Sequence, residues 1–341
     1  MRLTTFLCVI GLVCFGGACQ PNQAKPQGRG IKPPTEAPLP PPRQPVALDP
    51  QLIAAADAEI AQALRSPDPL IRSHGLEAIR DAGATRYNPD IVQALSDSDS
   101  RVRFAAALAV GELKLSEAHA KLLSMAEDPS INVRVAVRFA LHRLGDTRLS
   151  HDLETYAAWT ADARVRGNTA MVLGMLGEPS GVKLLKVLRT DAEVPDGVAV
   201  RQEASEALWR LGDEDGLKDL VAMTLSKYPD DRIIGYLGLA MPRDTTIRQH
   251  VRAGLVSEKD WPEVPLAAAR AMGMLGSDEG YVIAQEGAAS SDARQRALAA
   301  LAFGAIGRSD SQEILRKLLA DPDDKVRISA ATAILQLKPP Q

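Results

Sequence analysis

A spacing of about 31 residues organises most of this chain. Nine positions, aliphatic in all but one case and in most cases followed by arginine, are each followed by a run of small and apolar residues. The intervals between them are 31, 31, 32, 35, 33, 31, 31 and 31 residues. A fixed period of this length is typical of a repeat array and not of separate globular domains. The nine positions are Ile71, Val102, Val133, Val165, Val200, Ile233, Val264, Gln295 and Val326.

Small and large apolar residues follow each of these positions at fixed distances. The seventh residue after each is alanine in eight of nine repeats, and the eighth is large and apolar in all nine. Positions 0, 4, 7, 8 and 11 form one stripe on a helix of 3.6 residues per turn. The pattern therefore predicts a helix in each repeat, packed closely at its alanine. The two sets are Ala78, Ala109, Ala140, Val172, Ala207, Ala240, Ala271, Ala302, Ala333 and Ile79, Val110, Leu141, Leu173, Leu208, Met241, Met272, Phe303, Ile334.

The end of each predicted helix is marked by glycine in six repeats: Gly83, Gly145, Gly177, Gly212, Gly276 and Gly307. Glycine adopts the left-handed conformation that ends a helix without steric cost. A polar turn and a second amphipathic run follow, as in Ser311–Leu319. Each unit is thus a helical hairpin that buries its apolar faces only against its neighbours. We predict an all-α fold, an α-solenoid or superhelical array of about nine hairpins.

Two neighbouring repeats depart from the pattern. Ile234 and Pro265 occupy the position where arginine is usual, and Pro242 falls late in the sixth predicted helix. Proline inside a helix removes a backbone hydrogen bond and clashes with the preceding turn. We therefore expect a bend or an altered twist around residues 228–265.

From Gln51 to about Leu337 the chain resembles the short HEAT-like repeats first noticed in phycobilisome lyases. The resemblance rests on the aliphatic–arginine pairs, some of which have an aspartate six residues earlier. It implies that these side chains form a structural ladder between successive repeats, with ligand binding as the alternative. The residues concerned are Arg72, Asp97, Arg103, Asp128, Arg134, Arg166, Arg201, Arg296, Asp321 and Arg327.

The first fifty residues have a different character. One positive charge, a short apolar run and the small residues Gly16, Gly17 and Ala18 precede Cys19, an arrangement typical of an export signal. The segment is similar to bacterial lipoprotein precursors, although leucine is usual where Gly16 stands. We expect a signal peptide over 1–18, lipidation at Cys19 and a proline-rich tether over 19–50, followed by the solenoid over 51–338 and a tail over 339–341. Ordinary secretion and an uncleaved segment are the alternatives.

The composition argues against several classes of chemistry. All three cysteines lie within the first nineteen residues, so the body of the chain has no thiolate for a disulfide or a metal site. The five histidines lack metal-ligand spacing, and we interpret them as solvated helix-surface residues. A net charge of −3 provides no basic excess for nucleic acid. We expect no metal, no cofactor, no catalytic residues and no nucleic-acid partner.

The surface remains as the candidate site of function. We expect the arginine-bearing helices to line the concave face, where repeats two to four carry six apolar side chains suited to a partner-binding groove. Packing between neighbouring helices is the alternative interpretation of these positions. They are Phe104, Leu108, Val135, Phe139, Met171 and Met175.

These features predict a membrane-anchored, extracytoplasmic scaffold or adaptor that binds a protein or peptide. We expect it to be a monomer or part of an envelope complex on the periplasmic face of a bacterial membrane. Gln20 after Cys19 favours the outer membrane. A bilin-lyase-like or other enzyme-associated HEAT-repeat protein is the alternative, and a nucleic-acid-binding protein is a third.

Overall fold

The computed structural model describes residues 39–40, 46–159, 162–190, 197–256 and 260–337. Within these ranges the chain forms eighteen α-helices in sequential pairs and no β-strand, as the repeat pattern predicts. The outer helices are α1 (Pro50–Leu64), α3 (Asn88–Ala94), α5 (His119–Ser124), α7 (Asp152–Trp159), α9 (Val182–Arg189), α11 (Glu214–Met223), α13 (Arg248–Arg252), α15 (Tyr281–Ala288) and α17 (Gln312–Leu318). The inner helices are α2 (Pro69–Ala82), α4 (Ser100–Leu113), α6 (Ile131–Arg143), α8 (Ala163–Leu176), α10 (Gly197–Arg210), α12 (Pro229–Ala240), α14 (Glu263–Met274), α16 (Ala293–Ile306) and α18 (Asp324–Leu337).

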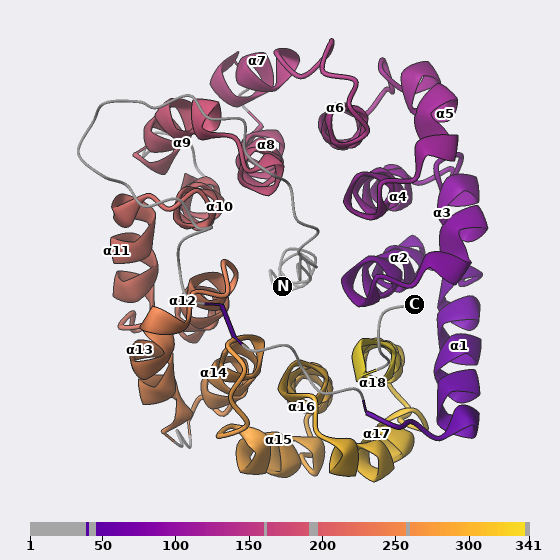
Figure 1. Ribbon diagram of the computed structural model, residues 1–341, viewed down its shortest axis with the longest axis vertical. Helices are drawn as coiled ribbons and strands as arrows, with labels where there is room; N and C mark the ends of the chain where they lie inside the picture. Colours follow the sequence, from indigo (N-terminus) through magenta and orange to yellow (C-terminus); the bar gives the residue numbers. More distant parts are fainter. Residues whose placement is uncertain (1–38, 41–45, 160–161, 191–196, 257–259, 338–341) are drawn as a thin grey trace.

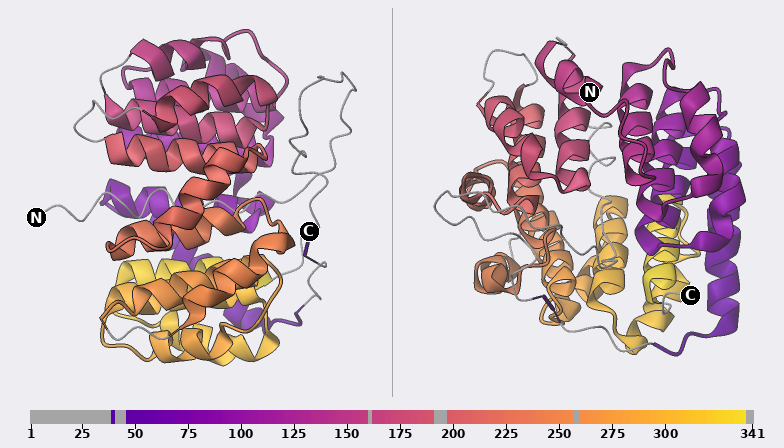
Figure 2. Two further views of the ribbon diagram at one scale, coloured as in Figure 1. Left: turned by 90° about the vertical axis from the view of Figure 1, so that its left-hand side faces the viewer. Right: turned by 45° about the horizontal axis from the view of Figure 1, so that its top comes forward.

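The array closes into a ring. The even-numbered helices surround the centre and the odd-numbered helices lie outside them (Figure 1). The inner helices are seen nearly end-on in Figure 1 and lengthwise in the left view of Figure 2. The last inner helix, α18, packs against both α1 and α2. The sequence predicts the inner position of the arginine-bearing helices, but it gives no indication that the two ends of the solenoid meet.

Short 3₁₀ segments precede or follow several outer helices and complete the turns of the hairpins. They are η3 (Thr85–Tyr87), η4 (Ser116–Ala118), η5 (Pro179–Gly181), η6 (Thr245–Ile247), η7 (Ala253–Leu255) and η8 (Ser309–Ser311). The sequence also explains where the inner helices begin. Asp68, Asp99, Asp162 and Asp292 each accept a backbone N–H bond at the start of an inner helix. This satisfies a donor that has no partner within the helix.

The glycines predicted to end the inner helices do so. All six have φ between +61° and +92°, the left-handed region in which a side chain would be strained. In the first, third, fifth and seventh repeats the residue after the glycine donates its N–H to the carbonyl five residues back, as Asp146 does to Leu141. This bond satisfies a terminal helix carbonyl.

The predicted apolar stripe forms the core. The side chains at the seventh position are at most 3% exposed in all nine repeats, and those at the eighth are buried in all but one. The larger apolar cluster joins residues 52–208 to residues 269–337, so apolar contacts continue across the meeting point of the two ends. A second cluster lies between Trp209 and Ala305.

The irregular sixth repeat requires a correction. Pro242 does not lie inside a helix, because α12 ends at Ala240 and Met241 is its C-terminal cap. The early end leaves Met241 half-buried, the one exception among the large apolar positions. Helices α10 and α12 contact each other less than other neighbouring inner helices do, and the second apolar cluster begins at this boundary. Pro265 is tolerated because it lies in the first turn of α14.

The predicted signal peptide, Cys19 and most of the proline-rich segment lie outside the described residues. Within the described part of the chain, no helix combines the length and the apolar composition needed to span a membrane.

Candidate functional site

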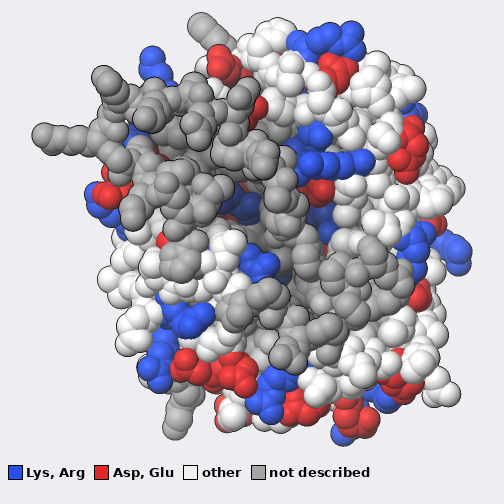
Figure 3. All heavy atoms as spheres, viewed as in Figure 1, with Lys and Arg blue, Asp and Glu red and all other residues white. Residues whose placement is uncertain are grey.

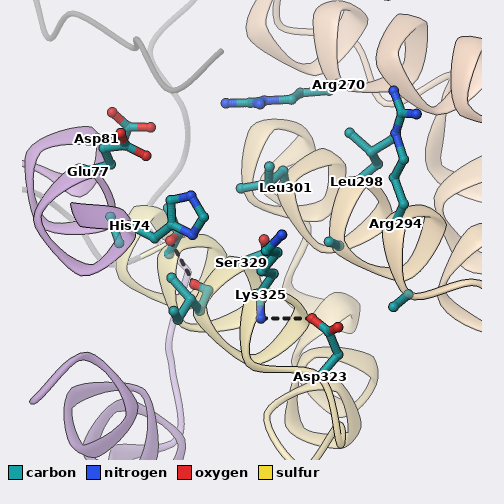
Figure 4. Close-up of a pocket in the computed structure, with 15 residues that line it drawn as sticks. His74, Glu77, Asp81, Arg270, Arg294, Leu298, Leu301, Asp323, Lys325 and Ser329 are labelled. Atoms are coloured by element: carbon teal, nitrogen blue, oxygen red, sulfur yellow. Dashed lines mark hydrogen bonds between the residues drawn. The ribbon is translucent and has the colours of Figure 1, made fainter. Parts of the chain in front are cut away.

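A cavity opens on the inner face of the ring where the two ends of the array meet. Its volume is about 250 Å³, and its walls come from α2, α14, α16 and α18. These helices belong to the first and to the last three repeats, so only ring closure brings them together. Figure 4 shows the lining side chains converging from the four helices on one space.

One wall of the cavity is acidic. His74, Glu77 and Asp81 follow one another on α2 with the spacing of a single helix face. Asp81 is 4% exposed, and the Arg80 guanidinium donates to its carboxylate at 3.1 Å. Burial outweighs this attraction and raises the pKa of Asp81 to about 6. Burial, with the charge of Lys325 as a second cause, lowers the pKa of His74 to about 4.

The opposite wall is basic. Arg270 extends from α14 over the cavity towards the α2 wall, and Arg294 stands beside it on α16 (Figure 4). Arg270 is 4% exposed. Arg294 is half-buried and donates to Asp230 at 2.6 Å. Lys325 and Asp323 line the base of the cavity at the start of α18.

The floor between these walls is apolar. Leu298 and Leu301 of α16 and Ile328 of α18 form most of it, with Ala78 and Ala297 at its edges. A concave apolar surface with a few converging charged groups is the usual form of a ligand site. The cavity is therefore our candidate functional site.

A second charged cluster lies on α10. Arg210 donates to Glu206 at 2.9 Å across one helical turn. Burial and the neighbouring Glu206 raise the pKa of Glu203. The cluster is not among the residues that line the cavity, and we do not include it in the candidate site.

The residues predicted to line an apolar groove have a different environment. Leu108, Val135, Phe139 and Met175 are between 0% and 6% exposed, and Phe104 and Met171 are half-buried. The groove interpretation is corrected for the four buried side chains, because they fill the space between neighbouring inner helices. The Phe139 ring, for instance, lies against Gly111 of the preceding inner helix.

Several of the predicted ladder residues connect successive repeats. Arg72 donates to both carboxylate oxygens of Asp97, Arg103 to those of Asp128, and Arg296 to those of Asp321. Each of these arginines also donates to two backbone carbonyls of the turn before its own helix. The Arg296 guanidinium holds the pKa of Asp321 below its usual value.

The remaining ladder residues are less regular. Arg134 donates to the backbone carbonyl of Asp128 and pairs with Glu127. Arg166 is buried, Arg201 is exposed, and Arg327 pairs with Glu59 of α1. None of these residues lines the cavity, so the structure places them between repeats and not at the candidate site.

Sequence reasoning missed most of the cavity. It interpreted His74 as a solvated helix-surface residue, whereas the side chain is 9% exposed. Arg270 and Lys325 belong to none of the motifs described in the sequence. The sequence does place charged residues at inner-face positions of the first and seventh repeats. Because these repeats are distant in the chain, their positions alone do not indicate that the residues meet in one cavity.

Among the described residues, no group of three or more His, Cys, Asp or Glu side chains is arranged to hold a metal ion. On the face seen in Figure 3, acidic and basic side chains are interspersed. The lining of the cavity combines three cationic side chains, three carboxylates and an apolar floor, which suits binding of an amphiphilic group.

Comparison with known proteins supports the repeat assignment. Residues 58–141 match the family model of HEAT repeats. The complex of CpcE and CpcF of phycocyanin lyase from Nostoc sp. PCC7120 is similar at 16% identity and a TM-score of 0.44, covering 78% of this chain and 98% of that one. Human deoxyhypusine hydroxylase is similar at 17% identity and a TM-score of 0.37, covering 84% and 97%. A search of curated proteins finds no match.

These similarities concern the fold. The protein is an α-solenoid whose HEAT-like hairpins close into a ring. Within it, residues 58–141 are the stretch that matches HEAT repeats.

Proposed function

We propose that this protein is a membrane-tethered scaffold that binds a protein or peptide partner inside its ring. The observation that carries the proposal is the cavity between the ends of the array, with its apolar floor and opposed charged walls. HEAT-like arrays present concave surfaces of this kind to partners. We assign no catalysis to the residues that line the cavity.

The tether is the second part of the proposal. An export signal ending in Gly17, Ala18 and Cys19 supports lipidation of Cys19 and attachment to the periplasmic face of a bacterial membrane, with the outer membrane favoured. The proline-rich segment after Cys19 would hold the ring away from the bilayer, because proline favours extended chain.

Photo-crosslinking in cells tests the partner. A photoreactive amino acid replaces Ser329, which lines the cavity, and in a control strain it replaces Lys218, whose side chain is 68% exposed on α11. We expect one identified protein to be captured from position 329 and not from position 218. Equal capture from both positions, or from neither, would remove the ring interior from the proposal.

Metabolic labelling with a radioactive fatty acid tests the tether separately. The wild-type chain should incorporate label and sediment with membranes, and the Cys19→Ser variant should do neither. Label that persists in the variant would refute lipidation at Cys19.

A further inference from the structure

Arg270 is a buried cation that faces the cavity without a hydrogen-bond partner among the described residues. Its side chain extends from α14 into the space between the walls (Figure 4), and 4% of its surface is exposed. Among the described residues, no hydrogen bond or ion pair engages its guanidinium. A guanidinium remains protonated in proteins and presents five N–H donors. The Asp81 carboxylate attracts this charge across the cavity but forms no hydrogen bond with it. A buried cation without hydrogen-bond partners is costly, which makes this arrangement unusual for a purely structural residue.

The neighbouring charges are already engaged. Asp81 accepts from Arg80 at 3.1 Å, and Arg294 donates to Asp230 at 2.6 Å. Asp323 accepts the backbone N–H of Lys325 at 2.9 Å and caps α18. The Lys325 ammonium is more exposed, so Arg270 is the buried cation of this cavity whose hydrogen-bonding capacity is left for a bound molecule.

The balance of charge restricts that molecule. The cavity is lined by three cationic side chains, Arg270, Arg294 and Lys325, and by three carboxylates, Glu77, Asp81 and Asp323. A dianion such as phosphate would meet the acidic wall of α2 at close range. A monoanion carries less charge and meets less of that repulsion, and the planar guanidinium fork matches a carboxylate in bidentate geometry.

The apolar floor of the cavity determines which uncharged group the ligand carries. Leu298, Leu301 and Ile328 offer an aliphatic surface beside Arg270, in a volume of about 250 Å³. A short aliphatic group would be removed from water there, which favours binding. A small polar anion would leave this surface uncovered.

We propose that the cavity binds the carboxylate of an aliphatic, amphiphilic ligand, with the carboxylate on Arg270 and the aliphatic body on Leu298, Leu301 and Ile328. Two sources share this chemistry: a free medium-chain carboxylic acid, and the C-terminus of a protein chain that ends in aliphatic residues. The second source rests on the proposed function, and the first does not.

Calorimetric titration of the full chain carrying Cys19→Ser tests the site with four probes. They are hexanoate, N-acetyl-leucyl-leucine, the same dipeptide as its C-terminal amide, and inorganic phosphate. We expect at least one of the two carboxylates to bind saturably, and neither the amide nor phosphate to do so. Tighter binding of hexanoate identifies a free acid as the source, and tighter binding of the dipeptide identifies a chain terminus.

Variants connect the binding to Arg270. Arg270→Gln should weaken carboxylate binding by about 10- to 100-fold, because a charge-assisted bidentate contact is lost, and Arg270→Lys should recover part of the affinity. Arg252→Gln removes an arginine that is 57% exposed on α13 and should leave binding unchanged. Circular dichroism confirms that each variant is folded.

Failure of both carboxylates to bind, or equal binding by Arg270→Gln, overturns the inference. The partner proposal is separable from it. Capture from Ser329 without carboxylate binding would leave the scaffold function standing and remove this ligand class. Carboxylate binding without capture from Ser329 would support this ligand class and remove the partner proposal.

Discussion

Arg327 of α18 donates through Nε to Oε1 of Glu59 on α1 at 3.1 Å, across 268 residues of chain. In three other repeats the arginine at this position binds an aspartate of the next repeat, as Arg296 binds Asp321. At Arg327, in the ninth repeat, Glu59 of the first helix provides the carboxylate instead. The ladder between repeats therefore continues across the point where the chain ends meet.

This contact predicts that the ring is closed in solution. Cysteines introduced as Glu59→Cys and Arg327→Cys should be joined within one molecule by a short bismaleimide, because the two native side chains contact each other at 3.1 Å. A protein carrying Cys19→Ser, with the signal peptide removed, provides a thiol-free background. Mass spectrometry of the digested monomer band measures the crosslink.

The matched control pairs Glu59→Cys with Lys218→Cys, since Lys218 lies on α11, on the other side of the ring (Figure 1). It should give no crosslink within a monomer. An open solenoid in solution would make the two pairs indistinguishable.

The ladder itself should contribute to stability. Asp128 is 6% exposed at its side chain and accepts two hydrogen bonds from Arg103, each at 2.9 Å. Asp128→Ala should lower the free energy of unfolding by about 2–4 kcal/mol, because it leaves a partly buried guanidinium without its carboxylate. Urea denaturation measures the change. Glu214→Ala breaks an exposed pair with Lys218 and should cost less than about 0.5 kcal/mol. Similar losses in the two variants would show that the ladder has no special role.

Much of this fold could be predicted from the sequence, because its determinants are local. Eight residues after Ile71, Ile79 lies in the core, and four residues later Gly83 ends the helix. Spacing within one helix reveals both facts. The position of Arg270 opposite Asp81 could not be predicted in this way. It depends on the summed rotation of nine hairpins, in which small differences between repeats decide whether the ends meet.

The same limit explains the misplaced groove. Phe139 and Val135 point away from the stripe of their own hairpin, so a single repeat leaves them exposed. In the ring both are 0% exposed, because the neighbouring inner helices approach closely enough to cover them. Whether such a position faces solvent or a neighbour depends on the distance between repeats, which one repeat's sequence does not contain.

Asp81 should make the protein less stable as pH rises. Its pKa is about 6 in the folded protein and 3.8 in the unfolded chain. Between these values the unfolded state ionises first, so stability falls as pH rises from about 4 to about 6 and stays lower above that. The full loss is about 3 kcal/mol. The stability of Asp81→Asn relative to the wild type should therefore be greater at pH 7.5 than at pH 4.5, measured by urea denaturation. Asp90→Asn, at an exposed position, should show no such difference.

The effect of His74 on stability should have the opposite dependence on pH. Its pKa is about 4 in the folded protein, against 6.5 in the unfolded chain. As pH falls from about 6.5 to about 4, the imidazole is protonated in the unfolded chain but stays neutral in the folded protein, so the free energy of unfolding decreases. His74→Gln should be more stable relative to the wild type at pH 5 than at pH 7.5. Parallel denaturation of His74→Gln and Asp81→Asn separates the two effects, which partly cancel in the wild type. A pH-independent difference for His74→Gln would mean that the histidine titrates normally.

The close approach of the inner helices leads to the last prediction. A Cβ atom at Gly273 of α14 would lie 2.6 Å from the backbone carbonyl carbon of Ala305 in α16. Backbone atoms cannot move aside as a flexible side chain can, so Gly273→Ala must push the two helices apart. We expect it to lower the free energy of unfolding by about 1–3 kcal/mol.

Gly167 of α8 provides the matched control, because the nearest atom to its added Cβ is the Glu203 Cγ at 3.7 Å, an ordinary contact. There the better helix propensity of alanine prevails, and Gly167→Ala should stabilise the protein by about 0.5–1 kcal/mol. The two substitutions are chemically identical and both lie within inner helices, so opposite signs in thermal unfolding would isolate the helix contact as the cause. Stabilisation by Gly273→Ala would show that α14 and α16 are farther apart than the ring requires.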